Sequence, residues 1–241
     1  MYADLLNKAE KAALLSGEIL VKHEQKKINS LSGKDIKLQA DIDSERILID
    51  ALKETNISIL SEETGLVEIN NDSDLLWIVD PLDGSLNYSR GIPLNCISIA
   101  LWNINEPILG VIYDFNHNNI YKGLIGEGAF LNNKKIHVSE IYEKSNSVIA
   151  TGFPVYFSFE DKTIVDFIKT VKEYKKVRLL GSAALSLSLV ATGSVEAYSE
   201  QNIAFWDVAA GIALVKAAGG RVEYEFVDAK KNLMNVLVTN R

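Results

Sequence analysis

The sequence predicts an α+β fold, with an antiparallel sheet in the first half of the chain and a mixed α/β arrangement in the second. Two observations lead to this prediction. Short strand-like segments separated by turn formers occupy residues 94–131, and after about residue 139 strands alternate with helices. The change of pattern divides the chain into two expected lobes, 1–139 and 140–241, packed as one compact unit.

Two amphipathic helices are expected near the start of the chain. Apolar residues recur at helical spacing over residues 4–20, and Asp41 precedes a second such pattern after a polar stretch at 22–34. The expected inward stripe of the first helix is Leu5, Leu6, Ala9, Ala12, Ala13, Ser16 and Ile19. The expected inward face of the second helix is Ile42, Ile47, Leu48, Ala51 and Leu52.

Short apolar runs predict the strands. Residues 57–60 lead into Ser61-Glu62-Glu63, and residues 75–79 lead into Asp80. The expected antiparallel segments are 94–102, 108–115, 120–124 and 129–131. In the second half the expected strands are 148–151, 177–180, 195–198 and two closing strands, and the expected helices end near Phe167, begin at Ser182 and span 206–218.

The composition favours a folded protein with an acidic surface. The chain has 241 residues, of which 47% are hydrophobic and 24% charged, and its net charge is −7. This balance argues against a nucleic-acid partner, and an anionic substrate would need a bound cation to attract it. The sequence shows neither a signal peptide nor an apolar run long enough for a membrane span, so we expect a cytoplasmic protein with no membrane partner.

The segment from Trp77 to Asn87, Trp-Ile-Val-Asp-Pro-Leu-Asp-Gly-Ser-Leu-Asn, carries the clearest chemical signal. An apolar strand delivers Asp80, and Asp83 stands three residues on, where a helix is expected to begin. Two carboxylates on a rigid turn can bridge metal ions, and the backbone N–H groups of Gly84 and Ser85 can face a phosphate. The structural alternative is that one aspartate caps a helix and the other forms a turn.

Three further acidic positions weaken that alternative. They are Glu62 after a short strand, Asp41 at the start of the second helix, and Asp207 in Phe205-Trp206-Asp207, where an apolar helix begins. Each position alone is commonly a helix cap, because a capping aspartate stabilises a helix by about 1 kcal/mol without any catalytic role. Single residues therefore do not decide the function, and the combination does.

The combination resembles the inositol monophosphatase superfamily. The order Glu-Glu, Trp-x-x-Asp-Pro-x-Asp-Gly-(Ser/Thr)-x-Asn and Trp-Asp-x-Ala-Ala-Gly is similar to that family's pattern, and the resemblance extends to residues 150–154 and 180–185. It implies a layered αβαβα sandwich and hydrolysis assisted by roughly two or three Mg²⁺ ions. The metal ligands that it implies are the carboxylates of Glu62, Asp80, Asp83 and Asp207 and the Leu82 carbonyl.

The resemblance also implies the other roles in the site. Ser85 and Asp41 would take the proton of the attacking water, with Glu62 assisting. Gly181, Ser182, Ala183 and Glu200 would contact the substrate, although Ser182 reads equally well as a helix cap and Glu200 as a surface acid on a loop. Two departures bear on these roles: Ser85 stands where many members have Thr, and Leu38-Gln-Ala-Asp41 replaces the usual Thr-x-x-Asp.

The substrate expected from this reading is inositol monophosphate or a similar polyol phosphate. The alternatives are a 3′(2′),5′-bisphosphate nucleotide, fructose 1,6-bisphosphate and histidinol phosphate. Nucleotidase relatives tend to carry Ser-Glu before Trp-Asp, whereas this chain has Ala204-Phe205 there.

A silent regulatory binding protein is the non-enzymatic alternative, and the family suggests a homodimer. The histidines His23, His117 and His137 show no ligand spacing and are expected at the surface.

Overall fold

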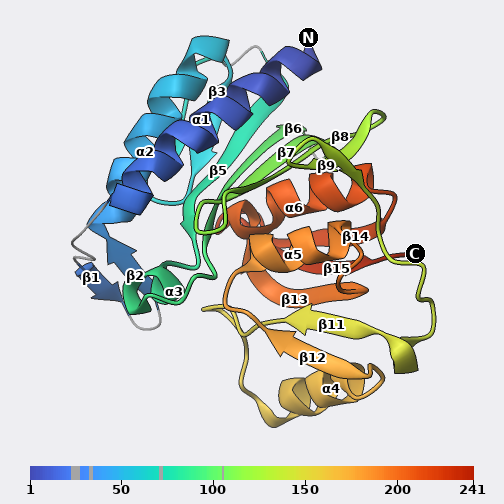
Figure 1. The fold of residues 1–241 in the computed structure, drawn as a ribbon. Helices are drawn as coiled ribbons and strands as arrows, with labels where there is room; N and C mark the ends of the chain where they lie inside the picture. Colours follow the sequence, from blue (N-terminus) through green and yellow to red (C-terminus); the bar gives the residue numbers. More distant parts are fainter. Residues whose placement is uncertain (23–27, 33–34, 71–72, 105) are drawn as a thin grey trace.

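Helical layers and sheets alternate through the computed structural model, which describes residues 1–22, 28–32, 35–70, 73–104 and 106–241 (Figure 1). Helices α1 (Tyr2–Lys22) and α2 (Gln39–Leu52) form the first layer. An eight-stranded sheet, the pair α5 and α6, a five-stranded sheet and the outer helix α4 follow in that order. The expected layered αβαβα sandwich of the α+β class is therefore confirmed.

The eight-stranded sheet is antiparallel except for one pair. Its strand order is β10-β9-β8-β7-β6-β5-β3-β4, and only β3 and β5 run parallel. The strands are β3 (Ser58–Ser61), β4 (Gly65–Val67), β5 (Leu75–Asp83), β6 (Cys96–Asn103), β7 (Glu106–Asp114), β8 (Asn119–Leu124), β9 (Gly128–Leu131) and β10 (Lys134–Ile136). The parallel pair matters for function, because it brings the ends of β3 and β5 to the same edge.

The five-stranded sheet is mixed. Its order is β12-β11-β13-β15-β14, with β11 parallel to β12 and β13 and the remaining pairs antiparallel. Its strands are β11 (Val148–Thr151), β12 (Lys176–Leu179), β13 (Ala197–Ala204), β14 (Arg221–Asp228) and β15 (Leu233–Thr239). Helices α5 (Ala183–Ala191) and α6 (Phe205–Ala217) lie between the two sheets and are buried along almost their whole length.

Two hydrophobic cores hold the layers together. One joins α1 and α2 to the outer face of the large sheet, and the other joins the two sheets through α5 and α6. Trp102 of β6 lies in the second core, where its ring meets Phe205 at 4.8 Å between centroids. The outer helix α4 (Asp161–Val171) has no buried residue, and a pocket of about 390 Å³ lies between it and strands β11 and β13.

The inward faces of the first two helices differ in part from the predicted ones. On α1 the buried stripe ends in Gly17 and Leu20, while Ile19 is exposed. On α2 the buried face contains Ala40, Asp41, Ser44, Glu45, Leu48 and Leu52, and Ile42 is exposed. Both predictions were wrong at these positions. On α1 the helical stripe continues from Ser16 to Leu20 and leaves Ile19 outside it, and on α2 the polar residues Asp41, Ser44 and Glu45, which a hydrophobic pattern ignores, take inward positions.

Several short elements fall outside the predicted ones. Strand β1 (Ile28–Ser32) lies within the expected polar stretch and pairs antiparallel with β2 (Asp35–Leu38), which follows that stretch. Strands β4 and β10 extend the large sheet at its two ends. The remaining short elements are α3 (Ser85–Arg90) and the 3₁₀ turns η1 (Lys53–Thr55) and η2 (Lys144–Asn146). Strand β13 continues to Ala204, so the predicted end at residue 198 was wrong.

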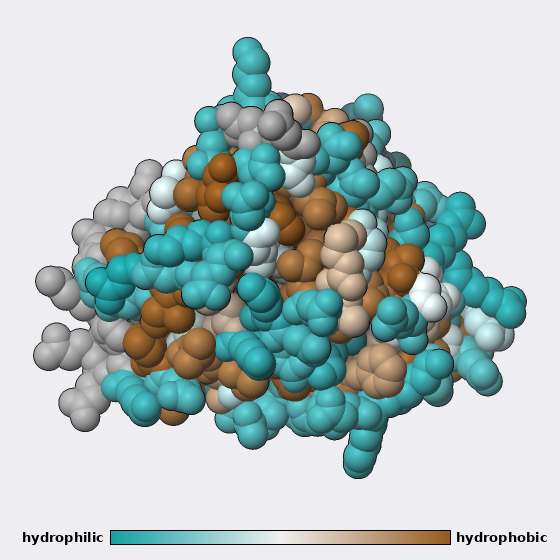
Figure 2. Space-filling view, turned by 90° about the horizontal axis from the view of Figure 1, so that it is seen from above, coloured by the Kyte–Doolittle hydropathy of each residue, from teal (hydrophilic) through white to brown (hydrophobic). Residues whose placement is uncertain are grey.

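The described residues contain no helix that is both long and apolar enough to cross a membrane. On the face shown in Figure 2, hydrophobic side chains form separate patches among hydrophilic ones rather than a continuous belt.

Candidate active site

The two motif aspartates lie at the end of β5. Seven consecutive residues of this strand are buried, which carries the carboxylates of Asp80 and Asp83 into the interior with 1% and 7% exposure. Pairing with β6 is interrupted between the two aspartates, and the Leu82 N–H donates to Asp80 Oδ1 at 2.9 Å. Such an irregularity turns side chains that would otherwise alternate, so both acids can serve one site.

A glycine is required where the strand turns into α3. Gly84 has φ of 86°, and a Cβ there would come within 2.8 Å of the Leu94 carbonyl oxygen. From α3, the Asn87 side-chain amide donates to the carbonyls of Leu94 and Leu180, each at 2.8 Å. The motif is thereby attached to the segment that leads into α5, from the other half of the chain.

Four acids predicted as metal ligands lie close enough to affect one another. Burial, followed by the negative charges of Glu62, Asp83 and Asp207, raises the pKa of Asp80 well above its ordinary value. Glu62 at the end of β3 and Asp207 in the first turn of α6 also line one pocket of about 150 Å³. Elements from both halves of the chain therefore contribute to one acidic region.

This acidic region fits a hard divalent cation by its donor chemistry. Carboxylate and carbonyl oxygens are the ligands that Mg²⁺ prefers. Two carboxylates 4 Å apart repel by about 4 kcal/mol at an effective dielectric constant of 20, so without a counter-charge they stand apart or take up protons. Among the described residues, no three His, Cys, Asp or Glu side chains lie together in a geometry that could hold a metal ion, so the fit rests on the kind of donor alone.

Asp41 and Ser85 form a second polar group beside the acidic region. Ser85 Oγ lies 2.9 Å from Asp41 Oδ1 and 2.9 Å from the Leu82 carbonyl oxygen, so one hydroxyl proton has two acceptors. The Leu38 N–H donates to Asp41 Oδ2 at 2.6 Å. Burial raises the pKa of Asp41 to about 7, against the opposing effect of these hydrogen bonds. Asp41 is thus a potential proton acceptor near neutral pH.

Helix α2 begins two residues before Asp41, at Gln39, so the prediction that Asp41 precedes the helix was wrong. The carboxylate of Asp41 reaches back to the N–H of Leu38, the residue that caps the helix. This contact satisfies one of the unpaired donors of the first turn and allows the helix to start earlier.

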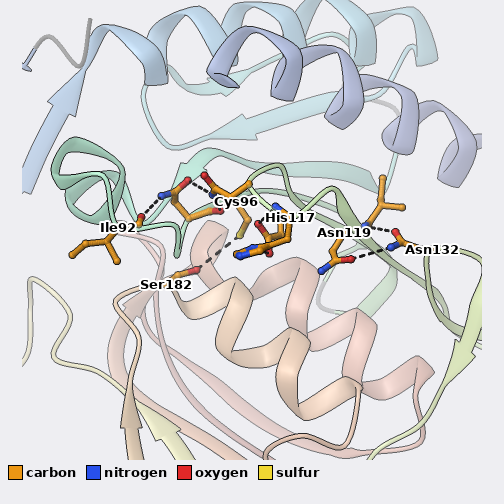
Figure 3. A network of polar contacts seen from close by, with 10 residues as sticks. Ile92, Cys96, His117, Asn119, Asn132 and Ser182 are labelled. Carbon is orange, nitrogen blue, oxygen red and sulfur yellow. Dashed lines mark hydrogen bonds and ion pairs between the residues drawn. The ribbon is translucent and has the colours of Figure 1, made fainter. Parts of the chain in front are cut away.

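Ser182 caps α5 and also contacts Asp83. Its Oγ accepts from the Leu185 N–H at 3.2 Å and donates to Asp83 Oδ2, to which the Ala184 N–H also donates at 2.8 Å. The thiol of Cys96 lies 3.7 Å from the same oxygen and 3.9 Å from Ser182 Oγ (Figure 3). Cys96 is a buried free cysteine.

The predicted substrate residues differ in exposure. Gly181 is exposed, whereas Ala183 is 7% and Glu200 is 9% exposed. Glu200 is a strand residue of β13 at a break in its pairing with β15, not part of a loop. Its carboxylate lies against Gly152, and burial raises its pKa to about 8, with a further contribution from the charge of Asp83.

Sequence reasoning missed two supporting residues on α2. Glu45 accepts hydrogen bonds from the Thr64 N–H at 3.0 Å and hydroxyl at 2.6 Å, which holds the loop that follows Glu62. The Ser44 hydroxyl donates to the Pro81 carbonyl at 2.7 Å. Their helical spacing from Asp41 was the available signal, since residues 41, 44 and 45 share one face of a helix.

The two histidines within the described residues, His117 and His137, are exposed to solvent, as expected. His117 is half exposed and contacts Asp114 at 2.8 Å (Figure 3), and His137 is exposed. His23 lies outside the described residues.

Comparisons with known proteins identify the family of this chain. A sequence model of the inositol monophosphatase family matches residues 1–237. The chain is 35% identical over 239 residues to Nus factor SuhB of Xylella fastidiosa, covering 96% of this chain and 86% of the relative. It is 37% identical over 225 residues to inositol-1-monophosphatase of Mesorhizobium japonicum, covering 90% and 84%.

Among solved structures, the inositol monophosphatase of Anabaena (Nostoc) sp. PCC 7120 superposes with a TM-score of 0.86 at 34% identity. The match covers 99% of this chain and 91% of that one. From the acidic motifs, the layered fold and these whole-chain matches, we conclude that the chain belongs to the inositol monophosphatase family.

Proposed function

We propose that this chain is a Mg²⁺-dependent phosphomonoesterase that hydrolyses a small polyol phosphate, with inositol monophosphate as the first candidate. The observation that carries the proposal is the 2.9 Å hydrogen bond between Ser85 and Asp41, which stands beside the acidic region around Asp80. A hydroxyl paired with a carboxylate of raised pKa is suited to accept a proton from water. The family membership and the name of a 37% identical relative, inositol-1-monophosphatase, support the same activity.

Glu62, Asp80, Asp83 and Asp207, together with the Leu82 carbonyl, would hold roughly two or three Mg²⁺ ions. Bound there, Mg²⁺ supplies charge neutralisation for the phosphate and a lowered pKa for a water molecule. The backbone N–H groups of Gly84 and Ser85, at the start of α3, would bind phosphate oxygens.

The protein's own part in the reaction is a proton transfer. As water attacks phosphorus in line with the leaving group, its proton passes to Ser85 Oγ, and the Ser85 proton passes to Asp41 Oδ1, 2.9 Å away. Glu62 would help to orient the water. The new P–O bond forms as the ester P–O bond breaks, and the leaving alkoxide takes a proton from a solvent water molecule, while Asp41 returns its proton to solvent. Phosphate and a free alcohol therefore result, and no side chain becomes phosphorylated.

The acidic character near Glu200 favours a polyol over a second phosphate. With a pKa of about 8, the Glu200 carboxyl is mostly protonated at neutral pH and can both donate to and accept from a hydroxyl group. We propose that it binds a ring hydroxyl, with Gly181 and Ala183 providing backbone contacts. A phosphate dianion offers acceptors alone and would use only the proton of this carboxyl, whereas a hydroxyl group can pair with both of its oxygens.

Phe205 gives a further reason to prefer a monophosphate over a 3′(2′),5′-bisphosphate nucleotide. Its ring is buried between Trp102 and Phe226, at centroid distances of 4.8 and 5.1 Å. The position before Trp206-Asp207 therefore belongs to the core and offers no polar group to a second phosphate.

A regulatory binding role is the second candidate, favoured by the name Nus factor SuhB that a 35% identical relative carries. The two roles are separable, because loss of a metal carboxylate would abolish hydrolysis without removing a binding surface elsewhere.

We further propose that residues 1–139 and 140–241 act as two lobes of one unit and that the protein is a cytoplasmic homodimer. Light scattering after size-exclusion chromatography tests the dimer.

The deciding experiment is a phosphate-release screen with and without Mg²⁺. Its substrates are inositol phosphates, sugar phosphates, histidinol phosphate and adenosine 3′,5′-bisphosphate. We expect Mg²⁺-dependent release from a polyol monophosphate, reduced about 100-fold or more by Asp83→Asn. The control is Asp50→Asn, which removes an exposed α2 carboxylate paired with Lys53. Equal turnover by Asp83→Asn and the unsubstituted protein would refute the assigned ligand role, and no release from any substrate would refute the proposed activity.

A further inference from the structure

Ser182 connects the two halves of the chain through a single carboxylate oxygen. The residue is 4% exposed, and its hydroxyl donates to Asp83 Oδ2, 99 positions earlier in the sequence. The Ala184 N–H donates to the same oxygen at 2.8 Å. The N-terminal turn of α5 thus holds a carboxylate that β5 delivers from the other sheet.

This arrangement leaves the two oxygens of Asp83 with different roles. Oδ2 already accepts from a hydroxyl and a backbone N–H, and the Cys96 thiol lies 3.7 Å from it. A carboxylate oxygen with this many donors has little capacity left for a cation, so Oδ1 is the oxygen available to a metal. The donors also fix the rotation of the carboxylate, which determines where Oδ1 points.

We infer that Ser182 is a positioning residue for Asp83, which sets divalent-cation affinity rather than contacting the substrate. This inference rests on the proposed function of Asp83 as a metal ligand. Groups that hold a metal-binding side chain in place typically change metal affinity by 10–100-fold when they are removed. The same hydroxyl has no proton left to donate to a substrate, because it donates to Asp83, and one of its two lone pairs accepts from the Leu185 N–H.

The test measures Mg²⁺ binding without substrate, by calorimetric titration and by the Mg²⁺-dependent rise in Tm. We expect Ser182→Ala to weaken Mg²⁺ binding about 10-fold or more and Ser182→Thr, which keeps the hydroxyl, to remain within about twofold. Ser188→Ala is the matched control, because Ser188 is also buried on α5 but donates only to the Ala184 carbonyl, at 3.0 Å. It should bind Mg²⁺ as the unsubstituted protein does.

Kinetics separates positioning from substrate contact. If Ser182 positions Asp83, saturating Mg²⁺ should restore kcat in Ser182→Ala, and the KM for substrate should stay unchanged. A raised KM with unchanged Mg²⁺ affinity would instead mean that the hydroxyl touches the substrate, and it would overturn the inference. Unchanged Mg²⁺ affinity in Ser182→Ala would overturn it as well.

Two further comparisons distinguish a loss of Mg²⁺ binding from a folding defect and from an absence of phosphatase activity. Since Ser182 also caps α5, Ser182→Val is compared with the isosteric Ser182→Thr, and both are measured well below their Tm. If only the threonine variant binds Mg²⁺ normally, the hydroxyl is responsible; equal binding by both contradicts the inference. If no substrate is hydrolysed but Ser182→Ala still binds Mg²⁺ more weakly, the proposed phosphatase activity fails while the positioning role stands.

Discussion

Replacing Asp41 by asparagine should make the metal-free protein more stable above neutral pH while abolishing turnover. Asp41 is 1% exposed, and its pKa is raised from 3.8 to about 7, chiefly by burial. In the unfolded chain the carboxyl loses its proton near pH 4, whereas in the folded protein it keeps the proton until about pH 7. Its contribution to stability is therefore complete below pH 4 and is lost as the pH rises through 7.

The size of the effect follows from the gap between the two pKa values. A gap of about 3 pH units, at 1.36 kcal/mol per unit, corresponds to roughly 4 kcal/mol of lost stability by pH 8, as an upper limit. The asparagine side chain carries no charge and can keep both contacts. Its carbonyl can accept from the Leu38 N–H, and its NH₂ can donate to Ser85 Oγ, which then donates only to the Leu82 carbonyl.

The assay is urea unfolding in EDTA between pH 5 and pH 8.5. We expect the free energy of unfolding to fall with pH more steeply in the unsubstituted protein than in Asp41→Asn, so that the variant becomes the more stable protein at pH 8. Asp50→Asn, at an exposed position of the same helix, should follow the unsubstituted protein. Parallel pH profiles for the protein and Asp41→Asn would show that Asp41 does not take up a proton on folding and would refute the reasoning.

Three other predictions concern the metal site and its support. Mg²⁺ at 100 times its dissociation constant should stabilise the folded protein by about 2.7 kcal/mol, and Asp80→Asn should remove that gain in thermal unfolding while stabilising the metal-free form. Gly84→Ala should lower the free energy of unfolding in urea by about 2 kcal/mol or more, because the left-handed φ and the Leu94 carbonyl both oppose a Cβ. Gly65→Ala measures the backbone cost alone, because Gly65 has φ of 77° and a Cβ there would have no atom within 4 Å. Equal losses in the two variants would contradict a clash with the Leu94 carbonyl. Glu45→Ala should weaken Mg²⁺ binding about 10-fold in calorimetry, because it releases the loop after Glu62 from its hydrogen bonds to Glu45. Glu45→Gln should bind Mg²⁺ almost normally. Identical Mg²⁺ affinity in both variants would show that Glu45 does not support the metal site through this loop.

The sequence was sufficient for most of the fold because its patterns are local. The strand into Asp80 is a continuous apolar run, as predicted, and α6 begins at Phe205, one residue before the predicted start at 206. The expected acidic motifs also lead to the right family, since their order along the chain is specific. Local patterns failed at Ile42, because on α2 the inward face is polar and a hydrophobic criterion selects the wrong side.

The supporting contacts of the site could not be predicted because they join distant segments. The Ser182 hydroxyl meets Asp83 across 99 positions, and Glu45 meets Thr64 across 19. Before the sheets are placed, Ser182 has the sequence properties of an ordinary helix cap. Only the three-dimensional arrangement distinguishes a hydroxyl that merely begins a helix from one that also holds the carboxylate of Asp83.

Helix α4 has a consequence for the dynamics of the molecule. It has no buried residue, and a pocket of about 390 Å³ lies between it and β11 and β13. A segment with so few apolar contacts opens at low free energy, well before the global transition. Amide hydrogens of α4 should therefore exchange with deuterium far faster than those of α5 and α6, which are enclosed between two sheets. Local melting of this outermost helix would open the pocket that Glu200 lines and would leave the acidic region around Asp80 in place.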